Sequence, residues 1–263
     1  MRIIRYRRAQ GDQTIRYGFL EGDTVLEFRG NLYEHFEVGP PVAGLPDVTL
    51  LAPVMPPKIV CVGRNYAAHA AELGNAVPAE PLLFLKPPSA VVGPGDPIVL
   101  PPGVGRVDFE GELALVIRRK TRQVAPDEVP DHVLGITCLD DVTARDLQKK
   151  DRTFARAKGF DTFCPLGPTL LVDDIRRPRR IETRVDGTVR QSGSTEDMIF
   201  DVCALVSYIS HIMTLVPGDV VATGTPPGVG PLAPGQAVSV EVEGVGALEN
   251  PVVSGRNPGA ITA

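Results

Sequence analysis

The sequence is poor in the residues that mark several large classes of protein. It has no tryptophan, four histidines and four cysteines, and no two cysteines form a CxxC pair. A disulfide framework or a cysteine-rich zinc site is therefore not expected, and the cysteines are predicted to be reduced thiols in a cytoplasmic protein. No apolar run approaches the length of a membrane span, and the first residues, MRIIRYRR, lack the apolar core of a signal peptide.

The chain also lacks an excess of positive charge. The formal net charge is −5, whereas proteins that bind nucleic acid usually carry a basic footprint. The RRPRR run at residues 176–180 follows two aspartates and contains a proline, which is typical of a solvated loop. We therefore expect neither a nucleic-acid partner nor a membrane partner.

Proline and turn residues divide the chain into two predicted domains. Residues 2–28 alternate in hydrophobicity between turn residues, which predicts a β-meander. The PVMPP run at residues 53–57 can continue neither a helix nor a central strand. We place the boundary there, with a small N-terminal β domain over residues 1–55 and a larger domain over 56–263. Short apolar runs dominate the larger domain, and no helix–strand alternation of the doubly wound type is visible.

The segment VDFEGELALVI, residues 107–117, carries the first candidate site. As one β-strand it directs Asp108, Glu110 and Glu112 toward the same face, while Gly111 leaves room for a close neighbour. Buried carboxylates need a positive partner, and hard cations such as Mg²⁺ prefer carboxylate oxygens. The alternative is a half-exposed edge strand whose acids are solvated.

A second candidate group lies on a short helix predicted within RNYAAHAAELG, where Gly74 forms the C-terminal cap. His69 and Glu72 are spaced i, i+3 and therefore share one face of that helix. Such a pair can act as a general base that a carboxylate orients. The alternative is a solvent-facing pair with no chemical role.

Other segments offer further ligand-binding groups. The proline- and glycine-rich stretch of residues 78–95, which contains Lys86, is predicted to be an irregular loop. A buried strand is predicted over residues 133–139, and Asp140 or Asp141 at its end can add a third carboxylate to a metal site.

Positive charge and hydrogen-bond donors are expected nearby. Arg145 can pair with the acids or with an anionic substrate, and Lys158 can supply the positive charge that an anionic intermediate needs. The sequence VVATGTPPGVG is predicted to be a strand that runs into a rigid loop, whose Thr223, Thr225 and backbone N–H groups can cradle a carboxylate.

Eight motifs then occur in order: GRNYAAHAAEL, FLKP, VVGPGDPI, DFEGELALVI, DDVTARDLQ, AKGFDTFCPLGP, STEDMIF and TGTPPGVGP. Together, over residues 58–253, they closely resemble the fumarylacetoacetate hydrolase family, including its acylpyruvase-like and 2-hydroxyhepta-2,4-diene-1,7-dioate isomerase-like members. The resemblance implies an α+β, mainly β fold: a mixed β-sandwich roll with a small N-terminal β domain. It also implies a homodimer built by the larger domain.

The resemblance also implies roles for individual residues. The implied ligands of a Mg²⁺ or Mn²⁺ ion are Glu110, Glu112 and Asp141. The implied catalytic residues are His69, Glu72 and Lys158. The implied substrate-binding residues are Arg64, Gln148 and Thr225. Many family members carry asparagine where this chain has Asp140, and the aspartate adds a charge near the metal.

The family's substrates are 2-oxo acids or their enols, so the resemblance implies a metal that stabilises an enolate. We expect hydrolysis of a C–C bond in an acylpyruvate-like substrate, with His69 and Glu72 activating water. Isomerisation of 2-hydroxyhepta-2,4-diene-1,7-dioate and decarboxylation of an oxaloacetate-like acid, both reactions of aromatic catabolism, use the same enolate and remain alternatives. The non-enzymatic alternatives are a catalytically silent metal-binding protein and a purely structural β-protein.

Overall fold

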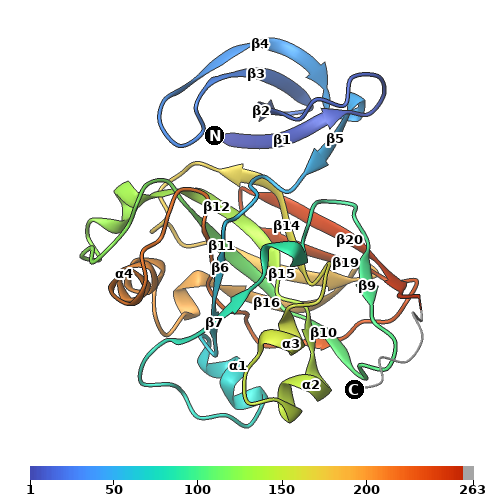
Figure 1. Cartoon of the computed structure of the whole chain (residues 1–263), viewed down its shortest axis with the longest axis vertical. Coiled ribbons are helices and arrows are strands. Elements are labelled where there is room, and N and C mark those ends of the chain that lie inside the picture. The colour runs from blue at the N-terminus through green and yellow to red at the C-terminus, as the bar shows by residue number, and fades with distance from the viewer. Residues whose placement is uncertain (257–263) are drawn as a thin grey trace.

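The computed structural model describes residues 1–256 and has the predicted α+β, mainly β architecture. A large sheet and a smaller sheet pack face to face, with N-terminal strands at one end and three short helices at the other (Figure 1). Within the described residues, no helix combines the length and the apolar character needed to cross a membrane.

The large sheet has twelve strands and includes both the N-terminal strands and the central strands of the sandwich. Its main path runs β4-β3-β2-β1-β14-β12-β11-β17-β6-β7, while β5 pairs with β1 and β8 pairs with β14. The strands are β1 (Arg2–Arg8), β2 (Arg16–Glu21), β3 (Thr24–Gly30), β4 (Phe36–Gly44), β5 (Val48–Leu51), β6 (Ile59–Gly63), β7 (Leu82–Lys86), β8 (Val91–Val92), β11 (Gly111–Ile117), β12 (Val133–Asp140), β14 (Cys164–Leu171) and β17 (Val220–Ala222).

Two smaller sheets and several helices complete the described chain. The five-stranded sheet runs β16 (Thr188–Ser194), β15 (Arg180–Val185), β19 (Ala237–Val242), β20 (Gly246–Ser254) and β9 (Ile98–Leu100), and the three-stranded sheet runs β13 (Thr143–Ala144), β10 (Val107–Phe109) and β18 (Gly230–Pro231). The α-helices are α1 (Ala67–Glu72), α2 (Arg145–Lys150), α3 (Ala155–Lys158) and α4 (Val202–Ile212). The 3-10 helices are η1 (Leu45–Asp47), η2 (Pro88–Ala90), η3 (Val129–His132) and η4 (Thr195–Asp197).

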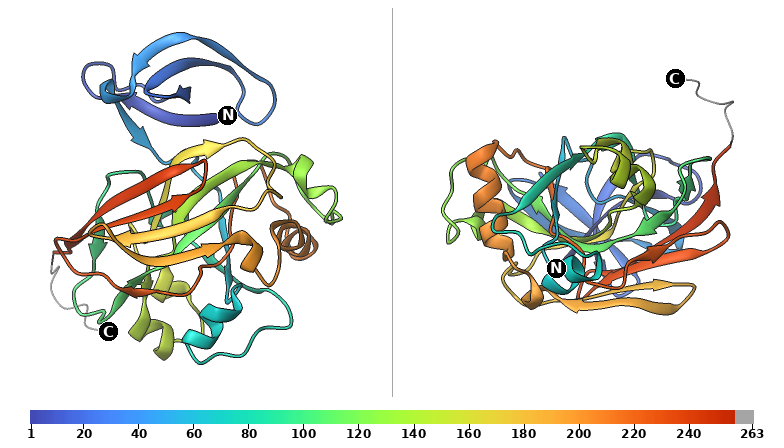
Figure 2. Two further views of the ribbon diagram at one scale, coloured as in Figure 1. Left: turned by 180° about the vertical axis from the view of Figure 1, so that it is seen from behind. Right: turned by 90° about the horizontal axis from the view of Figure 1, so that it is seen from below.

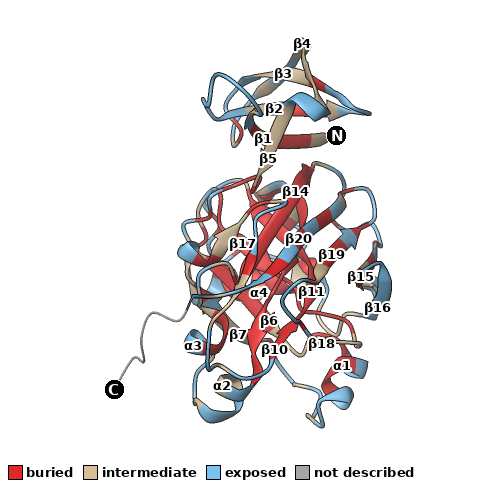
Figure 3. Ribbon diagram, turned by 90° about the vertical axis from the view of Figure 1, so that its right-hand side faces the viewer, coloured by how far each residue is buried: buried red, intermediate tan, exposed pale blue. Residues whose placement is uncertain are grey.

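Strand β11 is buried on both faces, and a different cluster of apolar residues packs against each face. Leu113, Leu115 and Ile117 pack in one cluster with residues of β15, β19, β20 and α4. Ala114 and Val116 face the opposite way and pack with residues of β1, β2 and β14. Figure 2 shows β15, β16, β19 and β20 of the five-stranded sheet, in orange to red, lying across the large sheet. Figure 3 shows the buried strands in red through the centre of the molecule.

The N-terminal meander is predicted correctly over β1 to β3, and β1 also connects it to the rest of the fold. Arg2 and Ile3 pair with Leu171 and Leu170 of β14. The N-terminal strands therefore extend the large sheet, although they form a visibly separate layer in Figure 1. The proposed division between residues 1–55 and 56–263 stays a prediction.

Two local expectations are wrong. The segment predicted as one strand over residues 107–117 is two strands, because β10 and β11 separate at Glu110 and pair with different neighbours. The predicted loop over residues 78–95 contains β7, which pairs antiparallel with β6 from Leu82 to Lys86. Its prolines flank that strand and none lies inside it, so they do not prevent the pairing.

Candidate active site and metal centre

A cavity of about 260 Å³ lies where β6, β11, β12 and β17 meet helices α1, α2 and α3. Helices α1, α2 and α3 lie at the end of the sandwich away from the N-terminal strands (Figure 1). The predicted site residues that line the cavity are Arg64, His69, Glu110, Glu112, Asp141, Gln148, Lys158 and Thr225. Glu72 does not line the cavity, but its carboxylate reaches His69.

Three carboxylates meet on one side of the cavity. Each of Glu110, Glu112 and Asp141 offers an oxygen, and these oxygens all lie within 4.8 Å of one another. Their convergence follows from strand geometry: Glu110 and Glu112 are two residues apart, and the Asp141 N–H donates to the Glu110 carbonyl at 2.9 Å. All three are buried, so the alternative of a half-exposed strand with solvated acids does not describe this site.

Glu110 is the carboxylate with the strongest positive surroundings. Its Oε2 accepts from Lys158 Nζ at 2.8 Å, and its Oε1 lies 2.6 Å from Arg145 Nη2. Burial acts to raise the pKa of Glu110, but Lys158 and Arg145 outweigh it and hold the pKa below the usual range. Arg145 is itself held by Asp108, whose Oδ2 accepts from Nε at 2.8 Å.

Glu112 has the opposite environment. Its Oε2 accepts from the Gly224 N–H at 2.8 Å, and among residues 1–256 it forms no ion pair with lysine or arginine. Burial, followed by the nearby charges of Asp141 and Glu110, raises the pKa of Glu112 well above its usual value. The predicted carboxylate-binding loop thus binds a carboxylate of the protein itself.

Asp141 is held by two lysines, one of which the sequence analysis placed in an irregular loop. Lys86 Nζ donates to Oδ1 at 2.6 Å and Lys158 Nζ donates to Oδ2. Lys86 is only 1% exposed, because β7 directs it inward beside β6. The apolar run before it and its motif FLKP were visible, but no sequence signal linked Lys86 to a residue 55 positions away.

Replacement of Lys86 by methionine should destabilise the protein strongly. The change leaves the buried Asp141 carboxylate with one cation fewer, and breaking a buried ion pair typically costs about 3–5 kcal/mol. We expect the thermal midpoint to fall by about 10 °C, measured in EDTA by calorimetry. Lys120→Met, at an exposed lysine, is the control, and equal midpoints for the two variants would contradict the structural role of Lys86.

The carboxylate cluster fits a hard divalent cation. It offers oxygen donors alone, they are buried, and Glu112 has no cationic partner of its own. Mg²⁺ and Mn²⁺ prefer such oxygen ligands, whereas zinc sites usually recruit histidine or cysteine. Glu110, Glu112 and Asp141 are therefore the residues that would hold the metal.

Asp140, next to the cluster, has a structural bond and an unpaired oxygen. Its Oδ1 accepts from the Glu110 N–H at 2.8 Å, while Oδ2 is buried without a hydrogen-bond partner among the described residues. Burial raises the pKa of Asp140 to about 7, against the opposing effect of that hydrogen bond. An asparagine at this position would accept the same backbone bond, so the observed bond does not require a charge.

The His69–Glu72 pair forms on helix α1 as its spacing predicted. His69 Nδ1 lies 3.2 Å from Glu72 Oε2, and His69 is 4% exposed. Glu72 Oε1 also accepts from the Gly228 N–H at 3.0 Å, which ties the helix to the glycine- and proline-rich loop after β17. With Nδ1 held by Glu72, the ring nitrogen left for a ligand in the cavity is Nε2.

The three predicted substrate-binding residues have different surroundings. Arg64 lies at the junction of β6 and α1 with φ of 59°, a left-handed conformation that glycine tolerates better. Gln148 Oε1 accepts from Arg145 Nη1 at 3.0 Å. The Thr225 hydroxyl donates to the Gly111 carbonyl at 2.8 Å. The same cavity wall contains Lys149, which the sequence analysis did not select.

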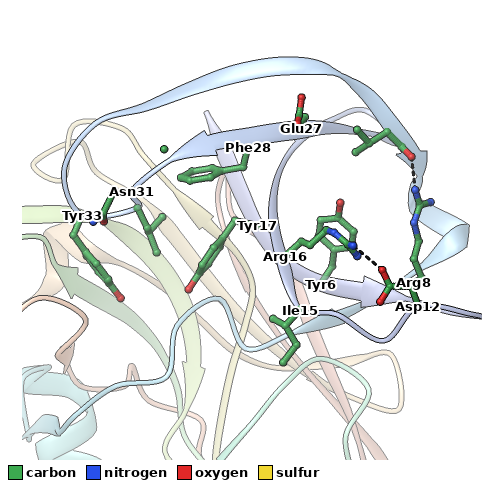
Figure 4. Close-up of a pocket in the computed structure, with 13 residues that line it drawn as sticks. Tyr6, Arg8, Asp12, Ile15, Arg16, Tyr17, Glu27, Phe28, Asn31 and Tyr33 are labelled. Atoms are coloured by element: carbon green, nitrogen blue, oxygen red, sulfur yellow. Dashed lines mark hydrogen bonds and ion pairs between the residues drawn. The ribbon is translucent and has the colours of Figure 1, made fainter.

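A larger hollow of about 840 Å³ lies on the N-terminal strands (Figure 4). None of the predicted site residues lines it. Its charged groups are already partnered: Arg16 pairs with Asp12 at 2.6 Å, and Arg8 donates to the Val42 carbonyl at 2.6 Å. We therefore assign the chemistry to the smaller cavity, where the carboxylates and the histidine converge.

The mainly β fold and a cavity that joins three buried carboxylates to an oriented histidine are the features to compare with known proteins. The family model described as fumarylacetoacetate (FAA) hydrolase C-terminal matches residues 58–253, and one described as Rv2993c-like, N-terminal, matches residues 1–53. The chain belongs to the fumarylacetoacetate hydrolase family, whose members are typically metal-dependent.

Three relatives indicate the range of activities among similar proteins. Human mitochondrial oxaloacetate tautomerase FAHD2A is 44% identical over 226 residues, 81% of this chain and 72% of the relative. The crystal structure of 5-carboxymethyl-2-hydroxymuconate delta-isomerase from Mycobacterium smegmatis is 42% identical, with a TM-score of 0.89 over 97% of this chain and 100% of that one. Fumarylacetoacetate hydrolase from Exiguobacterium antarcticum is 37% identical, with a TM-score of 0.85 over the same shares.

Proposed function

We propose that this chain is a Mg²⁺- or Mn²⁺-dependent enzyme that moves a proton between keto and enol forms, or between double-bond isomers, of a 2-oxo dicarboxylic acid. The observation that carries the proposal is the convergence of two groups in one cavity: a buried cluster of three carboxylates and a histidine that Glu72 orients. This arrangement offers both a cation site and a proton-transfer group.

The charge of the cavity wall supports a substrate with two acidic groups. Arg145 and Lys158 are paired with the buried acids. Arg64 and Lys149 also line the cavity and form no ion pair within residues 1–256. Two cationic side chains without an ion-pair partner suit a second carboxylate of the substrate, in addition to the one expected near the metal. Two of the named relatives also act on acids with more than one carboxylate, which favours the same substrate class.

The chain's own residues can carry out the proton transfer. When bound by the three carboxylates, the metal would supply a Lewis acid that stabilises negative charge on the substrate's oxygen. His69, oriented by Glu72, would take a proton at Nε2 from the carbon beside the 2-oxo group. The protonated ring, after exchange with solvent, would deliver a proton to the enolate oxygen or to another carbon of the substrate. A well-placed proton transfer of this kind is worth on the order of 10²–10⁴ in rate. Arg64 and Lys149 would hold the distal carboxylate.

Hydrolysis of a C–C bond in an acylpyruvate-like acid is the second candidate. The His69–Glu72 pair can equally activate a water molecule, and one similar structure is that of a fumarylacetoacetate hydrolase. Loss of CO₂ from an oxaloacetate-like acid would need no attacking water, so His69 has a smaller part in that reaction.

Turnover in D₂O distinguishes these reactions. Oxaloacetate, 2-hydroxyhepta-2,4-diene-1,7-dioate and an acylpyruvate would each be incubated with Mg²⁺, Mn²⁺ or EDTA. Proton transfer should give a product of unchanged carbon skeleton that contains solvent deuterium, and EDTA should suppress it. Two carbon fragments would indicate hydrolysis, and CO₂ would indicate decarboxylation. Equal rates with metal and with EDTA would reject a metal-dependent reaction.

Arg64→Gly should weaken substrate binding without harming the fold. Glycine relieves the left-handed backbone strain at φ of 59°. Its greater conformational freedom in the unfolded chain has an opposing cost of similar size. The free energy of unfolding should therefore change by less than about 1 kcal/mol. Loss of a charged hydrogen-bond donor should raise KM about 10- to 100-fold, measured by steady-state kinetics beside thermal unfolding.

Gln123→Gly is the matched control for that variant. Gln123 also has a positive φ, 54°, and it does not line the cavity. Its replacement should leave KM unchanged. An unchanged KM in Arg64→Gly would remove Arg64 from the substrate-binding set.

A homodimer built by residues 56–263 remains a proposal, which rests on family resemblance. Sedimentation velocity at micromolar concentration should give a species of about twice the 28.1 kDa chain mass. A single 28.1 kDa species over that concentration range would refute it.

A further inference from the structure

The peptide between the two metal-ligand glutamates is held by side chains from other parts of the fold. The Gly111 N–H donates to Gln191 Oε1 at 3.0 Å, and the Gly111 carbonyl accepts from Thr225 Oγ1 at 2.8 Å. Gly111 lies between Glu110 and Glu112, at the point where β10 ends and β11 begins. Its position therefore affects both glutamates.

Gln191 closes these contacts into a ring of three hydrogen bonds. Its Nε2 donates to Thr225 Oγ1 at 2.7 Å and to the Pro226 carbonyl at 2.7 Å. The amide orientation is determined by its partners, because Gly111 presents a hydrogen and Pro226 presents only an oxygen. The Thr225 hydroxyl must then accept from Gln191 and donate to Gly111.

The ring is buried and tightly packed. Gln191 is fully buried, and Thr225 is 3% exposed. A Cβ on Gly111 would approach Thr183 Oγ1 to 2.0 Å and Gln191 Oε1 to 3.3 Å, so β15 and β16 press directly against this peptide. Gly111 therefore cannot shift toward these strands unless Thr183 or Gln191 also moves.

The loop of residues 223–228 joins this ring to both halves of the site. Near its start, the Gly224 N–H donates to Glu112, and at its end the Gly228 N–H donates to Glu72. Gln191 holds its middle at Thr225 and Pro226. One amide side chain of the five-stranded sheet thus fixes a loop that contacts both the carboxylate cluster and the partner of His69.

We propose that Gln191 is a positioning residue for the site: it sets the spacing of Glu110 and Glu112 and the orientation of the Thr225 hydroxyl. The inference rests on the proposed function, which assigns those residues to metal and substrate. Residues that orient metal ligands typically account for 10- to 100-fold in metal affinity or activity. We expect Gln191→Met, which keeps the size and removes the hydrogen bonds, to lower Mg²⁺ affinity about 10-fold and to raise KM.

Asn250→Leu is the matched control, because Asn250 is equally buried and donates to the Gly93 and Asp96 carbonyls away from the cavity. Both variants should lower the thermal midpoint. Calorimetric titration without substrate should show weaker Mg²⁺ binding in Gln191→Met alone. Wild-type Mg²⁺ affinity and KM in Gln191→Met, beside a lowered midpoint, would assign Gln191 a purely structural role and overturn the proposal.

Thr225 allows a second test, because its hydroxyl takes part in the same ring of hydrogen bonds. Thr225→Val should reduce Mg²⁺ affinity, whereas Thr225→Ser, which keeps the hydroxyl, should not. Should Gln191→Met fail to fold, unchanged Mg²⁺ affinity in Thr225→Val would overturn the proposal. If both variants fold, their effects on Mg²⁺ affinity should not add in the double variant, because each opens the same ring.

Hydrogen exchange tests the positioning role of Gln191 independently of the proposed reaction. Gln191→Met should accelerate exchange in peptides covering residues 108–113 and 222–228, and Asn250→Leu should accelerate it in neither. This readout needs no metal and no turnover. A wild-type protein that converts none of the acids would reject the proposed function alone, while wild-type exchange in both peptides of Gln191→Met would reject the positioning role.

Discussion

Glu112→Gln and Glu110→Gln should both abolish tight Mg²⁺ binding, yet change stability in opposite directions. Each variant replaces an anionic ligand by a neutral one of the same shape. Because Lewis-acid stabilisation contributes several kcal/mol to the barrier, turnover should fall about 1,000-fold in each case. Titration calorimetry would measure the loss of binding, and steady-state kinetics the loss of turnover.

The stability difference follows from the charges around each side chain. Glu112 faces Asp141 and Glu110 and has no cationic partner of its own, so neutral glutamine relieves repulsion and should raise the thermal midpoint of the protein in EDTA. Glu110 pairs with Lys158 and Arg145, so its neutralisation leaves two buried cations less well paired and should lower the midpoint.

The metal-loaded proteins provide the control for this comparison. Wild-type protein should gain stability on adding Mg²⁺, because a ligand that binds only the folded state stabilises it, and neither variant should. Equal midpoints for both variants in EDTA would contradict the electrostatic difference between the two glutamates. Undiminished Mg²⁺ binding in either variant would remove that residue from the ligand set.

The sequence predicted those parts of the site whose partners are close along the chain. Glu110 and Glu112 share a face because they are two residues apart, and His69 and Glu72 because they are three apart on a helix. The predicted convergence of the two glutamates is observed even though the predicted single strand is wrong. β10 and β11 separate at Glu110, and carboxylate oxygens of Glu110 and Glu112 still lie close together.

Contacts between distant strands could not be predicted in the same way. Lys86 reaches Asp141 across 55 residues, and Gln191 reaches Gly111 across 80. Each depends on which strands become neighbours and in what register, and that is set by packing of the whole sandwich rather than by local alternation. The prolines around Lys86 suggested a loop rather than a buried strand, and Gln191 lies on β16, where no site residue was predicted.

The family resemblance predicted roles for individual residues, which their spacing along the chain could not do, but it did not identify the reaction. It implied the ligand set and the catalytic pair. In the structure Glu110, Glu112, Asp141 and His69 line one cavity, and Glu72 contacts His69 from outside it. It did not select among reactions, since relatives include a tautomerase, an isomerase and a hydrolase. The reaction depends on whether His69 transfers a proton to and from the substrate or activates a water molecule.

His69→Ala should reduce proton transfer or hydrolysis about 10²- to 10⁴-fold, the usual contribution of a positioned acid–base group. Mg²⁺ affinity should stay within a factor of two, because the carboxylate cluster does not include His69. Affinity for oxalate, as a metal-binding competitor, should be equally little changed. His35→Ala, at an exposed histidine outside the cavity, is the control and should retain full activity.

The pattern of losses across substrates identifies the reaction. For a tautomerase or isomerase, His69→Ala should suppress both turnover and the entry of solvent deuterium into the product, and Glu72→Gln should have a smaller effect because it only orients the ring. For a decarboxylase, His69→Ala should lower the rate only modestly, and Lys158→Ala should lower it more. Full activity in His69→Ala on every substrate would end the acid–base role, since no other histidine lines the cavity in residues 1–256.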